Sequence, residues 1–160
     1  MHIGFMNSDF LISLLTALHV VVVVLWIGGV AFVTVIIFPM LLKMEDSLEK
    51  ALMFQRIEGR FARHARVYVV LAGISGFALL YLTDRFGDLF TADGVGITVM
   101  LVVWVVFALV LAFERKIFQI LFDRPEKIDP EKVFFRLSAF HWVVLALSLL
   151  AVAAGVWEGH

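Results

Sequence analysis

The length of its uncharged runs is the feature that most limits how this chain can fold. Between Asp9 and Lys43 there are 33 consecutive residues without a charged side chain. A helix needs only about 20 apolar residues to cross the hydrocarbon core of a bilayer. Hydrophobic types make up 62% of the chain, well above the roughly 45–50% of a soluble domain. A soluble protein needs a polar face on every element, so the expected solvent is lipid.

Four stretches of the chain are apolar enough to span a membrane. We therefore predict an all-α fold, an integral membrane four-helix bundle that occupies residues 1–160 as a single transmembrane domain. The predicted helices cover about 9–44, 48–83, 94–122 and 130–157. The first is longer than the bilayer is thick, so it should tilt or project from the membrane.

The predicted helix ends rest on capping and helix-breaking residues. Asp93 is the expected N-cap of the third helix. Pro125 and Pro130 mark the break before the fourth helix. Ser47 and Lys50 do not make a capping box, so the start of the second helix is only loosely placed.

Lysine and arginine predict the orientation. Six basic residues fall in the first connecting region and six in the third: Lys43, Lys50, Arg56, Arg60, Arg63 and Arg66, then Arg115, Lys116, Arg124, Lys127, Lys132 and Arg136. The opposite side has only Arg85. By the positive-inside rule the basic regions face the cytoplasm. We expect an up-down-up-down bundle with both termini outside, multi-pass in the cell inner membrane if the source is a bacterium.

Composition excludes several classes of function. The net charge of −1 argues against nucleic acid as a partner, because that partner requires a basic surface. The chain has no cysteine, which excludes disulfides, thiolate metal sites and covalent c-type haem attachment. Phosphate-binding loops, zinc-protease motifs and nucleophile elbows are absent from the sequence.

Three histidines and one methionine are the candidate metal ligands. Polar residues within membrane helices are costly and are often functional. With a rise of about 1.5 Å per residue, His19 and Met100 fall roughly 13 and 9 Å from the outer face, and His64 and His141 roughly 28 and 24 Å. Each pair comes from helices that would be diagonal in the bundle. Such pairs are typical of two haem b sites, one near each face.

Neighbouring residues are consistent with haem pockets. Gly73 and Gly76 would let a flat ring approach the second helix. Trp26 lies seven residues from His19 and shares its helix face. Four arginines at the inner end would pair with the propionates of an inner haem: Arg60, Arg63, Arg66 and Arg136.

Each of these features also has a simpler interpretation. A lone buried histidine such as His19 often bonds a serine or a carbonyl, and His64 between two arginines could simply be hydrated. Met100 could fill a gap in the packing. The glycines could serve helix packing and the arginines orientation alone. Met40 and Met44 share a helix face, but a few scattered methionines make a poor copper site.

Short runs in the four predicted helices resemble the CopD-like and HemJ-type membrane protein families. The runs that carry the resemblance are Leu18-His19 with Trp26-Ile27-Gly28-Gly29, then Arg56-Ile57-Glu58-Gly59-Arg60-Phe61 leading to Gly73 and Gly76, and Phe134-Phe135-Arg136-Leu137. HemJ-type proteins are four-helix haem b proteins linked to protoporphyrinogen oxidation. The resemblance implies that His19 is a haem ligand and sets Met100 where the family has a lysine.

This sequence departs from the family pattern at three other positions. Val35 stands where the family has an arginine, and Ala139-Phe140 where it has Asn-Glu. We therefore expect a membrane b-type cytochrome with one or two haems, which transfers electrons within or across the membrane with quinone or a small oxidant as partner. A protoporphyrinogen oxidase-like enzyme, a copper or haem carrier, and a non-redox membrane subunit are the alternatives. The chain could also form a homo-oligomer.

Overall fold

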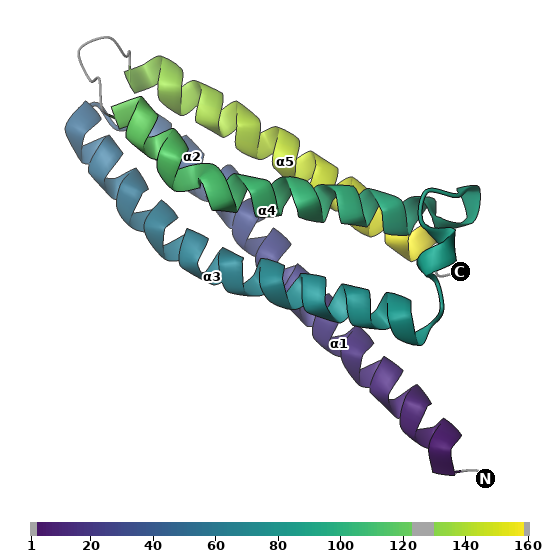
Figure 1. The fold of residues 1–160 in the computed structure, drawn as a ribbon. Coiled ribbons are helices and arrows are strands. Elements are labelled where there is room, and N and C mark those ends of the chain that lie inside the picture. The colour runs from purple at the N-terminus through teal and green to yellow at the C-terminus, as the bar shows by residue number, and fades with distance from the viewer. Residues whose placement is uncertain (1–2, 123–129, 159–160) are drawn as a thin grey trace.

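A computed structural model describes residues 3–122 and 130–158, and within them the chain is helical, without a strand. Its elements are α1 (Ile3–Phe32), the π-helix η1 (Val33–Ile37), α2 (Phe38–Leu42), α3 (Ser47–Leu82), the 3₁₀ helices η2 (Phe86–Asp88) and η3 (Ala92–Gly94), α4 (Val95–Phe122) and α5 (Pro130–Glu158) (Figure 1). Four segments are long and apolar enough to cross a membrane: Ser8–Leu42, Leu48–Leu82, Ala92–Phe113 and Glu131–Trp157. The all-helical fold with four candidate spans is confirmed.

The first span contains a π turn whose position follows from a proline. Pro39 stands in the first turn of α2. It has no N–H to donate, and its ring crowds the carbonyl of the preceding turn. The chain widens into η1 immediately before it, which absorbs this misfit. Thr34 within η1 is fully buried and donates its hydroxyl to the Val30 carbonyl at 2.7 Å.

The ends of the helices correct two expectations. The Asp46 carboxylate caps α3 by accepting hydrogen bonds from the backbone N–H groups of Leu48 and Glu49, at 2.8 and 2.9 Å. This is a well-defined start that the search for a capping box missed. The prediction of Asp93 as an N-cap is wrong, because Asp93 already lies inside η3 and Thr91 precedes that turn. The break at Pro125 lies outside the described residues.

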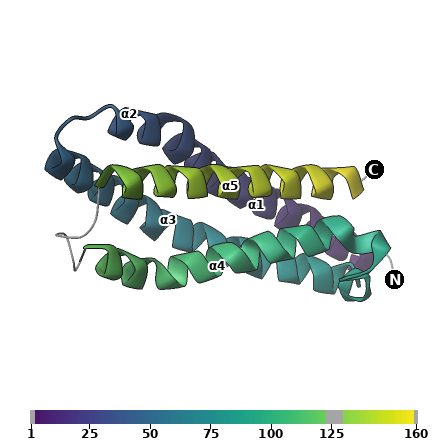
Figure 2. The ribbon, with the colours of Figure 1, turned by 90° about the horizontal axis from the view of Figure 1, so that it is seen from above.

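Each long helix packs mainly against two others. The most extensive contacts join α1 to α3 and α4 to α5, and lesser contacts join α3 to α4 and α1 to α5 (Figure 2). Helices α1 and α4 are therefore diagonal across the interior, as are α3 and α5. Figure 1 also shows the N-terminal part of α1 projecting past the other helices, in agreement with the excess length of this span.

Two clusters of buried side chains form the interior. All four long helices contribute to a central cluster, which consists of Val22, Trp26, Val30, Val69, Ala72, Phe107, Val144 and Leu145. A second cluster lies at the end where α3 and α5 begin, and it consists of Val33, Ile37, Phe38, Leu41, Phe54 and Phe134. Large apolar side chains also cover the outside of the helices, for example Phe10, Val24 and Ile74. An exterior as apolar as the interior suits contact with lipid.

Lys50 lies within the bundle rather than on a solvated loop. Only 4% of this residue is exposed, and its ammonium lies 5.9 Å from the centre of the Phe134 ring. Its long aliphatic stem explains how a residue counted among the basic loop charges contributes to packing.

Candidate functional site

His19 extends from α1 towards α3. Its Nδ1 lies 2.9 Å from the Ser75 hydroxyl oxygen, and the ring is partly buried. A Cβ atom on Gly76 would come within 3.2 Å of the His19 Cε1. The glycine therefore gives the imidazole room to lie against the α3 backbone.

The hydrogen bonds of Ser75 favour one tautomer of His19. The Ser75 hydroxyl has one proton, and its oxygen lies 2.7 Å from the Leu71 carbonyl and 3.2 Å from the Ala72 carbonyl. With the hydroxyl proton directed to a carbonyl of its own helix, as the 2.7 Å contact with Leu71 favours, the Ser75 oxygen accepts from His19 Nδ1. The proton of a neutral imidazole is then on Nδ1. Nε2 keeps its lone pair, which is the state a metal ligand needs.

Gly73 and Gly76, the two glycines predicted to contact a haem ring, lie against side chains from two different helices. Gly76 faces His19, whereas the Trp104 indole of α4 covers Gly73, where an added Cβ would lie 2.6 Å from Cζ2. Trp104 also donates its Nε1–H to the Val69 carbonyl at 2.7 Å. Gly73 thus serves the α3–α4 contact in this conformation, and its predicted contact with a haem ring stays a prediction.

Met100 lies on α4 and packs against α5. A Cβ atom on Gly155 would come within 3.0 Å of the Met100 sulfur, so the thioether packs directly over the backbone at Gly155. The position of Met100 relative to His19 follows from a contact deeper in the bundle. Trp26 of α1 meets Phe107 of α4, with ring centroids 4.5 Å apart and an angle of 85° between the rings.

This aromatic contact relates the two candidate ligands. His19 lies seven residues before Trp26, and Met100 lies seven residues before Phe107. Seven residues are two turns, so each ligand shares the face of its aromatic neighbour and lies roughly 10 Å along the helix from it. Both helices have their N-terminal ends at the same end of the molecule (Figure 2). His19 and Met100 therefore lie about equally far from this contact along diagonal helices, His19 against Gly76 of α3 and Met100 against Gly155 of α5.

Trp26 lies in the central cluster, between α1 and α4. Only 4% of it is exposed, and its Nε1 is the one fully buried side-chain nitrogen or oxygen without a hydrogen-bond partner in the part of the chain that the structure describes. An unpaired buried donor costs about 1–3 kcal/mol relative to a paired one.

The structure does not bring His64 and His141 together. His64 is exposed on α3, and its Nδ1 donates to the Arg60 carbonyl at 2.9 Å. His141 is partly buried on α5 and donates to the Leu137 carbonyl at 2.9 Å, with its ring centre 4.7 Å from that of Phe38. Since the two side chains face different surroundings, no described contact supports an inner haem site.

The arginines predicted around an inner haem lie mostly at the surface. Arg60, Arg63 and Arg136 are exposed, and Arg66 is half-buried with a partner. The Arg63 Nε donates to the Gly59 carbonyl at 3.3 Å.

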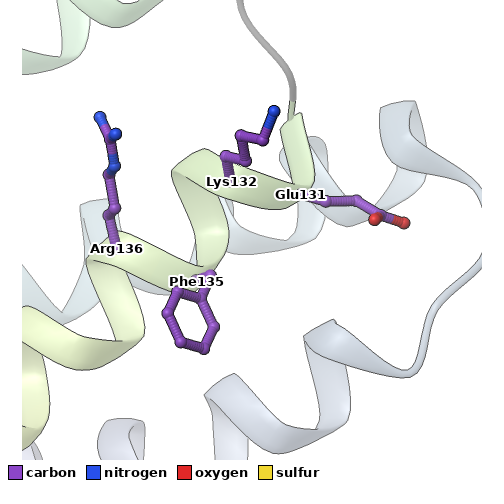
Figure 3. Close-up of a pocket in the computed structure, with 4 residues that line it drawn as sticks. All are labelled: Glu131, Lys132, Phe135 and Arg136. Carbon is purple, nitrogen blue, oxygen red and sulfur yellow. The ribbon is translucent and has the colours of Figure 1, made fainter.

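One shallow surface pocket also includes Arg136. It is lined by Glu131, Lys132, Phe135 and Arg136, all from the first turns of α5 (Figure 3). None of the candidate histidines lines it. Lys132 and Arg136 extend to the same side of the helix, with Glu131 and Phe135 directed elsewhere.

No known protein family, curated protein or solved structure matches this chain. The resemblance to HemJ-type and CopD-like proteins therefore stays a prediction, and the site depends on its own residues. Within residues 3–122 and 130–158, no three side chains of His, Cys, Asp or Glu gather as a metal site. A haem site needs only one or two protein ligands, and His19 offers the required lone pair in the tautomer with its proton on Nδ1.

Sequence reasoning missed four residues that shape this site: Ser75, Trp104, Phe107 and Gly155. Ser75 was detectable in principle, because it stands between Gly73 and Gly76 on a stretch of small residues. The other three lie in apolar runs where nothing in the pattern distinguishes the interior from lipid.

Proposed function

We propose that this chain is a b-type cytochrome of the cell inner membrane. Its four helices run up-down-up-down with both termini outside, and His19 Nε2 would hold the iron of one noncovalently bound haem b in the outer half of the bundle. The protein transfers electrons within or across the membrane, with quinone or a small oxidant as its partner.

The state of His19 is the observation that carries this proposal. With the Ser75 proton directed to the Leu71 carbonyl, His19 Nδ1 donates to Ser75 and Nε2 keeps the lone pair that an iron ligand needs. Metal-binding histidines commonly donate their other ring N–H to a fixed acceptor in this way, which orients the ring and raises its basicity. Ser75 is only 1% exposed, so the acceptor is firmly held.

Each protein group has a role around the haem. The bound haem supplies reversible one-electron redox chemistry. His19 holds the iron from α1, Ser75 orients His19, and the central cluster excludes water from the interior. Met100 offers a thioether on α4, the helix diagonal to α1. Thioether ligation raises a haem potential relative to two imidazoles. The inner pair His64 and His141 is left out, because His64 faces outward.

The proposed topology is supported by charge and by a short connection. The basic residues cluster at the ends that join the first helix to the second and the third to the fourth. The connection between α3 and α4 spans only residues 83–94 and carries Arg85, whose Nε is paired with the Asp88 carboxylate at 2.7 Å. A connection of this length joins neighbouring antiparallel helices.

The deciding experiment is the spectrum of the purified protein. Protein from haem-replete cells should show a Soret band, a b-type pyridine haemochrome and one haem per chain. His19→Ala should abolish the spectrum. The matched control His64→Ala should keep it, because this histidine faces outward. A colourless wild-type protein, or a spectrum that survives His19→Ala, contradicts the proposal and leaves the His19–Ser75 bond as a tether between helices.

A further inference from the structure

Phe90 is a large apolar side chain that lies mostly uncovered on the protein. It belongs to the connection between α3 and α4, and 76% of it is exposed. Its backbone has a φ of 63°, in the left-handed region that bulky residues rarely adopt. An unfavourable conformation of this kind persists only where surrounding interactions hold it. Phe90 therefore combines a firmly held backbone with a side chain that has little contact with protein.

Hydrogen bonds within the molecule hold the backbone at Phe90. Its N–H donates to the hydroxyl oxygen of Thr98 on α4 at 3.0 Å. The N–H groups of Asp88, Leu89 and Thr91 donate to carbonyl oxygens within the connection, at 3.0–3.3 Å. Backbone donors that are bonded within the protein do not need water, which is the condition for a chain segment to approach lipid.

The bond to Thr98 also sets the level of Phe90 relative to the membrane. The third candidate span starts at Ala92, and Thr98 lies six residues further along it. Helix α4 starts at Val95, so Thr98 is roughly 5 Å along the helix axis from that end. Phe90 therefore lies beside the first turn of α4 rather than beyond it. Figure 1 shows the connection coiled against this end of α4.

The side chains around Phe90 fit the boundary between acyl chains and headgroups. Aromatic side chains of membrane proteins concentrate at this boundary, because an apolar ring leaves water there. Arg85, the one basic residue of the connection, has its Nε paired with the Asp88 carboxylate at 2.7 Å. Asp84 and Asp93 are exposed. Their carboxylates limit the depth of the connection, because they require the hydrated headgroup region.

We infer that the Phe90 ring inserts into the lipid leaflet at the α3–α4 end of the bundle, and that the hydrogen bond to Thr98 holds it there. The partner is the bilayer itself, at the boundary between acyl chains and headgroups. This contact requires neither haem nor an electron partner, so it is independent of the proposed cytochrome function. It fixes the depth at which α4 enters the membrane.

The test is the accessibility of a spin label in phosphatidylcholine vesicles. The chain has no cysteine, so a nitroxide attaches only where a cysteine is introduced. Phe90→Cys carries the probe, and the exposure of Phe90 leaves room for the label. Ile74→Cys, at a side chain 63% exposed within the second candidate span, calibrates lipid. Glu45→Cys, at an exposed residue before α3, calibrates water. The ratio of oxygen collisions to nickel-chelate collisions for the Phe90→Cys label should be closer to that of Ile74→Cys.

Two results would overturn the insertion of Phe90. One is a collision ratio equal to that of Glu45→Cys, which would place the label in water. The other is a low rate with both reagents, which would mean that protein, such as a second copy of the chain, covers this position.

A second substitution in the labelled protein tests the bond to Thr98. Thr98→Val removes the hydroxyl acceptor and keeps the shape of the side chain, so the collision ratio should shift towards that of water. The control Thr83→Val should leave the ratio unchanged, because the Thr83 hydroxyl bonds only the Leu79 carbonyl of the preceding helix, at 2.7 Å. An unchanged ratio in Thr98→Val would overturn the role assigned to this bond.

Discussion

Replacing Gly73 by alanine tests whether the contact between α3 and α4 depends on the absence of a side chain at this position. The new methyl group would lie 2.6 Å from Cζ2 and 2.9 Å from Cε2 of Trp104, closer than van der Waals contact allows. The indole cannot move away freely, because its Nε1 is bonded to the Val69 carbonyl at 2.7 Å. Its ring also meets Phe77 edge to face, with centroids 5.8 Å apart.

The magnitude follows from three opposing effects. Overpacking costs about 1–3 kcal/mol, and a broken hydrogen bond adds about 0.5–1.5 kcal/mol. The better helix propensity of alanine offsets about 1 kcal/mol. We therefore expect Gly73→Ala to lower the free energy of unfolding by about 0.5–3.5 kcal/mol.

The assay is unfolding in mixed micelles with increasing sodium dodecyl sulfate, followed by circular dichroism. The matched control is Gly28→Ala, because nothing lies within 4 Å of a Cβ atom at that position. This control should be neutral or stabilising by up to about 1 kcal/mol. In a Trp104→Ala background the cost of Gly73→Ala should disappear, since the two residues are in contact. An unchanged cost in that background would refute the reasoning.

Four further outcomes are expected. Ser75→Ala should weaken haem binding about tenfold in a haem titration, because it removes the hydrogen-bond acceptor of the ligand histidine. The control Ser148→Ala should leave haem binding unchanged, because the Ser148 hydroxyl bonds only its own helix, at 2.8 Å. Met100→Leu should convert a low-spin haem spectrum to high spin, and an unaltered spectrum would remove Met100 as a ligand. Asp46→Ala should lower the free energy of unfolding by about 0.5–2 kcal/mol through loss of the α3 cap, measured against Asp46→Asn as control. Reporter fusions should place both termini outside, and a cytoplasmic C-terminus would contradict the proposed topology.

The number of helices and their approximate bounds followed from the sequence alone. The predicted second helix, 48–83, differs by one residue at each end from α3 at Ser47–Leu82. The reason is physical, because a bilayer accepts only segments of about 20 apolar residues that satisfy their own backbone hydrogen bonds. The start of α1 at Ile3, six residues earlier than predicted, shows that helix ends outside the apolar run are less determined.

Only the tertiary structure shows which side of each helix faces the interior of the bundle. In water, a polar stripe identifies the exposed side of a helix, but in lipid both sides are apolar. Nothing in the sequence could therefore show that Trp104 covers Gly73, that Met100 lies on Gly155, or that His64 points outward while His19 points to Ser75. These contacts join residues far apart in the chain, and only the packing of four helices together decides which apolar side faces the interior.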